Sequence, residues 1–185
     1  MALVIGMTPG RVYTETDLVQ GRCPGVGTFG EGIGTANAGG AITNIAARAN
    51  GGDLRQYVLV RVGAATNLVN GNVVQYAGDF TATLPGSAAA GLPNLGPLAV
   101  VIASITASTS QFVWAQVMGL CNALFEATTS AIPGAPLKLG GTSGQITAAA
   151  VTTASNYISG MQVAATVSAV GLGAVFLNYP RVISG

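Results

Sequence analysis

The pattern of apolar and polar positions after residue 54 is typical of short β-strands. In RQYVLVRVGAA, which begins at Arg55, both alternating sets of positions over 57–62 are mostly apolar, as in a strand packed on two faces. The run 98–108 is rich in β-branched residues, which favour strands. Glycine and proline separate the runs. The pattern therefore predicts several short strands folded into a small barrel or sandwich.

Further strands are expected on both sides of this region. In LVNGNVVQY, residues 68–76, the Asn-Gly pair between apolar runs is a strong hairpin signal. IPGAPLKLGGTSGQITAA, which begins at Ile132, is typical of a turn, a short strand, a second turn and a second short strand. Strands are also expected at 162–167 and 175–177, and Pro180 is expected to end the last.

The segment 111–126 fits two structures. Val113, Val117, Leu120 and Leu124 would form an apolar stripe on a helix. The run Phe112-Val113-Trp114 favours a strand, and Gly119 interrupts the segment. We expect two strands bent at Gly119, with a helix as the alternative.

Residues 1–54 differ from the rest of the chain. They are rich in glycine and weakly periodic, which predicts a largely irregular N-terminal arm with one short helix at 42–49. The fold class expected is therefore mainly β: an arm at 1–54, then a β-barrel-like domain at 55–185. A loop insertion is expected around 79–96, where proline and glycine recur.

GVGTFG, residues 25–30, matches the G-x-G-x-x-G pattern that binds the pyrophosphate of dinucleotides. That function requires a buried strand before the first glycine and a helix beginning near the last. The preceding ETDLVQGRCP is too polar for such a strand, and the four glycines of the following EGIGTANAGG disfavour a helix. We expect no nucleotide to bind, and the glycines to permit close contact with another surface. A nucleotide-binding enzyme is the alternative.

The small number of charged residues and their scattered positions make some classes of function unexpected. Charged residues make up 7% of the chain and the net charge is +1, whereas soluble domains average about 25% charged residues. The sparse charge predicts a surface that lies largely against partners. The cations are scattered, so binding to nucleic acid is not expected.

The stretch 161–177 is too short and too interrupted by polar residues and glycines for a membrane span, which needs about 20 apolar residues. MALVIGMTPGR lacks the basic start of a signal peptide, so we expect synthesis in a cytoplasm.

The residues needed for most catalytic sites are missing. The chain contains no histidine, which excludes Ser-His-Asp and Cys-His catalysis and histidine-based zinc sites. Lys138 is the only lysine, and the sequence identifies no serine as its partner. Cys23 and Cys121 lack metal-ligand spacing; they fit either two buried thiols or a disulfide. We expect no catalytic residue, no cofactor and no metal.

The order of several segments resembles the capsid decoration, or cement, proteins of tailed phages. The segments are YVLVRVGAATNLVNGNVVQYAG, then FVWAQVMGL followed by GAPLKLGGTSGQIT, and finally AVFLNYPRV, over roughly residues 56–182. The first 55 residues and the stretch 81–96 lie outside the pattern.

The resemblance implies a β-barrel-like virion protein, often a homotrimer, on the exterior of the capsid. Its partners would be the major capsid protein and further copies of itself, and it would stabilise the shell against the pressure of the packaged DNA. A phage tail subunit or another lattice-forming subunit is the alternative.

The N-terminal arm is the expected anchor to this partner, with packing of the arm on its own barrel as the alternative. Its few large apolar residues can bury little area, while ordering costs about 1–2 kcal/mol per residue. Such a segment orders best against another chain, for example by adding a strand to a sheet edge. The arm's cationic and aromatic side chains are the candidate capsid contacts. They are Arg11, Tyr13, Arg22 and Phe29.

Overall fold

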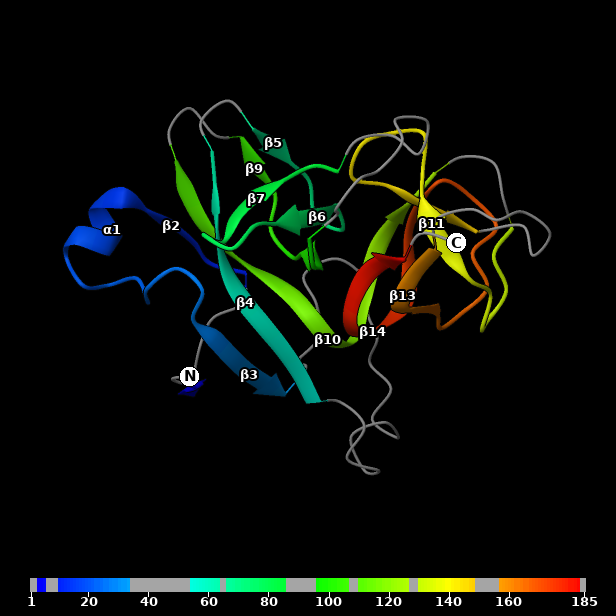
Figure 1. The fold of residues 1–185 in the computed structure, drawn as a ribbon, viewed down its shortest axis with the longest axis horizontal. Helices are drawn as coiled ribbons and strands as arrows, with labels where there is room; N and C mark the ends of the chain where they lie inside the picture. Colours follow the sequence, from blue (N-terminus) through cyan, green and yellow to red (C-terminus); the bar gives the residue numbers. More distant parts are fainter. Residues whose placement is uncertain are drawn as a thin grey trace.

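The structure is a computed structural model, and it describes residues 3–5, 10–33, 54–63, 66–85, 96–106, 110–126, 130–148 and 157–183 (Figure 1). The described residues form fourteen strands and one short helix, which confirms the mainly β fold class. The strands of the first half are β1 (Leu3–Ile5), β2 (Val12–Thr14), β3 (Phe29–Ile33), β4 (Leu54–Val62), β5 (Asn67–Leu68), β6 (Val73–Tyr76) and β7 (Thr81–Thr83). Those of the second half are β8 (Leu98–Val101), β9 (Ile105–Thr106), β10 (Gln111–Phe125), β11 (Leu137–Leu139), β12 (Ile146–Ala148), β13 (Tyr157–Val163) and β14 (Gly171–Ile183).

Five strands close a ring of hydrogen-bonded pairs. β4 pairs with β7, β7 with β6, β6 with β8 and β8 with β10, and β10 pairs again with β4. The side chains that fill this ring include the fully buried Val58, Val60, Val74, Val101 and Val113. A closed ring filled by alternate side chains is the arrangement of a small barrel. The sheet as a whole is not a simple barrel, because β1–β3 and β11–β14 extend beyond the ring.

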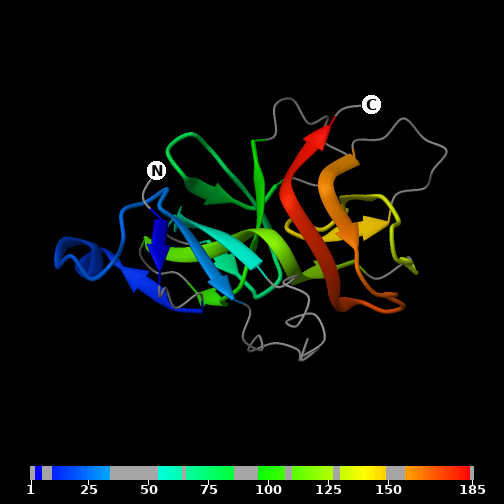
Figure 2. The same ribbon diagram turned by 90° about the horizontal axis from the view of Figure 1, so that it is seen from below.

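The second half of the molecule is built on the end of β10. β14 runs antiparallel to β10 from Met118↔Asn178 to Phe125↔Gly171, and β13 pairs with β14. The short strands β11 and β12, whose existence the sequence predicted, pair with each other, and β11 lies beside β13 (Figure 2). Phe125, Leu137, Ile146 and Val175 are buried in the core between these strands.

The described part of the N-terminal segment covers the outer face of the ring. β2 runs along β10 and β3 along β4, both antiparallel. The boundary expected at residue 54 therefore falls between two neighbouring strands of one sheet. The helix expected at 42–49 lies outside the described residues. Besides the core of the ring and the core between β10 and β14, a separate cluster of buried apolar residues lies beneath the N-terminal segment. Its members are Tyr13, Cys23, Tyr57, Leu59, Phe112 and Trp114.

β10 is a single strand of 15 residues and changes its partner halfway. It pairs with β4 over 111–118 and with β14 over 118–125. Gly119 lies at the change, with a φ of +93° that a side chain would disfavour. The strand expected at 111–126 is confirmed over the helix, and Gly119 redirects one strand instead of separating two.

The hairpin expected at Asn70-Gly71 does not form, although the turn does. The Asn72 N–H donates to the Val69 carbonyl at 3.0 Å, and Gly71 has a φ of +92°. The flanking strands pair elsewhere: β5 with β9, and β6 with β7 and β8. The Asn72 side chain explains the difference, because its amide donates to the Gly144 carbonyl and so holds the turn against another loop.

β14 continues through Pro180, where the sequence predicted its end. The pairing with β13 passes from Met161↔Leu177 to Ser159↔Arg181, so Pro180 lies in a bulge. A bulged residue contributes no ladder hydrogen bond, and the missing N–H of proline is tolerated there.

Candidate interaction surface

Two of the four candidate contacts lie together at the start of the described N-terminal segment. The Arg11 guanidinium lies 4.7 Å from the centre of the Tyr13 ring and 3.7 Å from Asp17 Oδ1. Arg11 is exposed, whereas Tyr13 is only 5% exposed. Tyr13 therefore packs into the chain's own core and supports the arginine from below.

The other two candidates are separated from this pair. Phe29 begins β3 opposite Val58 and packs half-buried against the core of the ring. Arg22 is exposed in the turn that follows the helix α1 (Glu15–Val19). Val19, at the end of α1, is 87% exposed. We call Arg11, Val19 and Arg22 the α1 corner; α1 projects at one end of the molecule in both ribbon views (Figures 1 and 2).

The helix α1 is held by a capping box that the sequence analysis missed. The Thr14 hydroxyl accepts from the Asp17 N–H, and the Asp17 carboxylate accepts from the Thr14 N–H at 3.0 Å. The Thr14 backbone and hydroxyl hydrogen bonds lower the pKa of Asp17. Thr14 and Asp17 have the three-residue spacing of this cap, which was the available signal.

The GVGTFG stretch is a turn against β4. The Gly27 N–H donates to the Leu59 carbonyl at 2.8 Å, and the Leu59 N–H donates to the Thr28 carbonyl at 2.9 Å. Gly27 has a φ of +78°, and the strand β3, not a helix, follows the motif. The glycine thus permits close contact between this segment and its neighbours, as expected from the sequence.

Large exposed apolar side chains concentrate near β14. Within 170–183 they are Val170, Leu172, Phe176, Tyr179 and Ile183, each at least 40% exposed. From Leu172 to Leu177, exposed and less exposed positions alternate, as in a strand with one solvated face. The bulge then shifts the alternation, because Tyr179 adopts a φ of +49° and both Asn178 and Tyr179 are exposed.

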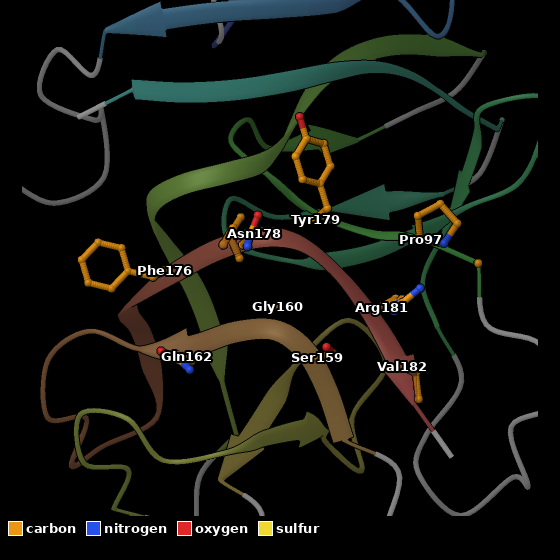
Figure 3. A pocket seen from close by; sticks show the side chains of 11 residues that line it. Pro97, Ser159, Gly160, Gln162, Phe176, Asn178, Tyr179, Arg181 and Val182 are labelled. Atoms are coloured by element: carbon orange, nitrogen blue, oxygen red, sulfur yellow. The ribbon is translucent and has the colours of Figure 1, made fainter. Parts of the chain in front are cut away.

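A groove of about 900 Å³ lies over this bulge (Figure 3). Its floor includes Gly160 of β13, whose φ is +75°. A side chain at this position would collide with the carbonyl oxygen of Asn178. The polar, charged and aromatic side chains of the lining are those of Ser159, Gln162, Phe176, Asn178, Tyr179 and Arg181.

Hydrogen bonds fix the Tyr179 ring. Its hydroxyl donates to Gln56 Oε1, and Gln56 Nε2 donates to Glu31 Oε1 at 2.7 Å. This chain of side chains links β14 to β4 and β3. Figure 3 shows the ring rising from β14 toward β4.

The two cysteines are free and buried. Burial raises the pKa of both thiols, so the thiolate is disfavoured at neutral pH. Within the described ranges, no group of three or more Cys, Asp or Glu residues is placed to hold a metal ion.

Comparison with models of known protein families and a search of curated proteins found no match to the chain. In the part of the chain that the structure describes, no helix has the length and apolar character needed to cross a membrane.

Proposed function

We propose that the protein is a structural virion protein that binds the outer lattice of a tailed-phage capsid and stabilises the shell. The observation that carries the proposal is the surface: the chain has thirteen charged side chains for 8983 Å² of accessible area, one of them, Arg55, is buried, and large apolar side chains are exposed. Such surfaces are typical of chains that pack against other chains. The segment order that resembles capsid decoration proteins supplies the kind of partner.

The α1 corner is the proposed capsid-facing surface. Arg11 and Arg22 are exposed, and the isopropyl group of Val19 is almost fully in water. An exposed apolar side chain and two exposed cations on one corner fit a partner surface with an apolar pocket and a carboxylate rim. Tyr13 supports this surface from behind, because its buried ring lies beneath Arg11, whereas Phe29 packs against the core of the ring and lies apart from it.

Self-association into a homotrimer is proposed at the opposite half of the molecule. Val170, Leu172 and Ile183 are exposed near or on β14 and do not line the groove. Contact between copies would remove these apolar side chains from water.

The capsid proposal is tested on particles from the virus that encodes the chain. The protein should be recovered on intact particles, and electron cryomicroscopy should place it at threefold or quasi-threefold positions of the shell. Arg11→Glu with Arg22→Glu should reduce co-sedimentation with stripped particles, while Arg181→Glu, an exposed cation at the other half, should not. Absence from particles would refute the proposal, and density on the tail would assign the protein to the tail.

The trimer is tested separately by analytical ultracentrifugation of the purified protein at micromolar concentration. A trimer is expected, and Leu172→Asp should shift it to monomer. A wild-type protein that is monomeric in solution and on particles would contradict the trimer.

A further inference from the structure

We propose that the groove over the β13–β14 bulge binds an acidic saccharide. Phe176 and Tyr179 would contact the apolar faces of sugar rings, Gln162 and Asn178 would bind the hydroxyl groups, and Arg181 would bind a sugar carboxylate. This site is separate from the α1 corner and does not depend on capsid binding.

The lining of the groove matches the two-sided chemistry of a sugar ring. Phe176 is 51% exposed and Tyr179 is 50% exposed, so each presents an aromatic surface to an incoming molecule. The carboxamides of Gln162 and Asn178 are also exposed, and each both donates and accepts hydrogen bonds. A sugar has a C–H face that packs on an aromatic ring and a rim of hydroxyls that both donate and accept. The groove volume lies within the usual range of roughly 300–1,000 Å³ for ligand sites.

Arg181 gives the groove a positive charge. Among the described residues, no ion pair or hydrogen bond engages its guanidinium. The described residues that line the groove include no aspartate or glutamate. A guanidinium can bind both oxygens of a carboxylate at once, so the charge favours a saccharide with a uronate group over a neutral one.

The groove is held in shape before any ligand arrives. Tyr179 keeps a left-handed backbone conformation that is uncommon for an aromatic residue. Its hydroxyl is bound by Gln56, which is fixed in turn by Glu31. Gly160 completes the bulge, because any side chain there would meet the backbone of Asn178. Backbone strain retained beside an open groove is a feature of binding sites, and a fixed platform lowers the entropy cost of binding.

A second copy of the chain is the competing occupant, and the lining disfavours it. The aliphatic exposed side chains, Val170, Leu172 and Ile183, lie outside the groove lining, whereas amide, hydroxyl and guanidinium groups stand within it. Interfaces between identical subunits are more apolar at their centre than the rest of the surface, whereas two carboxamides and a serine hydroxyl belong to this lining.

Isothermal titration calorimetry tests the proposal with a tetrasaccharide of galacturonic acid as probe and cellotetraose as the neutral control. The wild type should bind the acidic probe saturably and cellotetraose more weakly. Arg181→Gln should weaken binding of the acidic probe about tenfold. Arg22→Gln removes an exposed charge at the α1 corner, away from the groove, and should leave the affinity unchanged.

Two further variants test the aromatic contacts. Phe176→Ala should weaken binding of both saccharides. Tyr179→Gly removes the second ring at a backbone conformation that glycine prefers, so binding should fall while the unfolding transition is retained.

Three results would overturn the proposal. The first is no saturable binding of the acidic tetrasaccharide by the wild type. The second is an equal loss with Arg22→Gln, which would indicate unspecific attraction of an anion. The third is a change of sedimentation with Phe176→Ala in the absence of sugar, combined with unchanged sugar binding, which would make the groove an interface between copies.

Discussion

Replacing Gly27 with alanine tests whether the GVGTFG stretch is a structural turn. Gly27 has a φ of +78°, where an alanine costs about 1–2 kcal/mol. A Cβ at this position would also lie 2.5 Å from Cδ2 of Phe80. To avoid this contact the Phe80 ring must turn about its side-chain torsions and leave its present packing.

The two costs add to a measurable loss of stability. The Phe80 ring stacks on Tyr76 with a centroid distance of 5.9 Å, and losing such a pair costs about 0.5–1.5 kcal/mol. Together with the backbone cost, Gly27→Ala should lower the free energy of unfolding by about 2–3 kcal/mol. For a chain of this length, that corresponds to a fall of roughly 5–10 °C in Tm. Urea unfolding followed by tryptophan fluorescence, with calorimetry for Tm, gives both quantities.

The matched control lies in the same stretch. Gly25 does not have a positive φ, and a Cβ there would meet only Thr28 Oγ1, at 3.9 Å. Gly25→Ala should therefore leave stability within about 1 kcal/mol of the wild type. Equal stability of Gly27→Ala and the wild type, or a greater loss with Gly25→Ala, would refute the reasoning. NAD and ATP should shift the Tm of neither protein; saturable binding of either nucleotide would restore the enzyme hypothesis.

Three further outcomes are expected from the rest of the structure. Glu126 accepts hydrogen bonds from the N–H groups of residues 141 and 142 at 2.9 and 3.0 Å; Glu126→Ala should therefore cost about 1–3 kcal/mol of unfolding free energy, and Glu126→Gln, which keeps one acceptor, should cost less. The lowered pKa of Asp17 means that its cap stabilises the fold above the ordinary pKa of 3.8 and stops doing so as the pH falls through the lowered value. Asp17→Asn should flatten the acid limb of a stability–pH curve, and an unchanged limb would argue against the cap. A truncation beginning at Asp53 should aggregate or lose its cooperative transition, because it uncovers the cluster around Trp114. A truncated protein that still folds would instead show that the domain at 55–185 folds without the arm.

The sequence predicted strand positions well where both faces of a strand are buried. Val58 and Val60 face the ring core, while Tyr57 and Leu59 pack under the N-terminal segment. The continuous apolar run therefore correctly predicted a strand that is buried on both faces. Pairing between strands was harder to predict. The turn at Gly71 was correct and the hairpin wrong, because Asn72 binds a loop more than seventy residues away, a contact that local pattern does not encode.

The candidate contacts were chosen by residue type, and residue type does not reveal exposure. Tyr13 was selected as an aromatic anchor, yet its position opposite Phe112 on β10 buries it. The groove could not be predicted at all. It depends on a bulge that brings Gly160 opposite Asn178 and exposes Tyr179, and no local pattern specifies which residue of a strand becomes unpaired.

The shared strand β10 also constrains the order in which the chain can fold. Its first half has partners on both the N-terminal and the central strands, but its second half pairs with β14, whose residues are synthesised after all other described strands. Until then Cys121, Ala123 and Phe125, all buried in the finished fold, lack their cover. Pairings so distant in sequence form slowly and leave apolar surface open to aggregation. The nascent chain therefore depends on its last strand to become soluble, and expression yield should be most sensitive to changes in that strand.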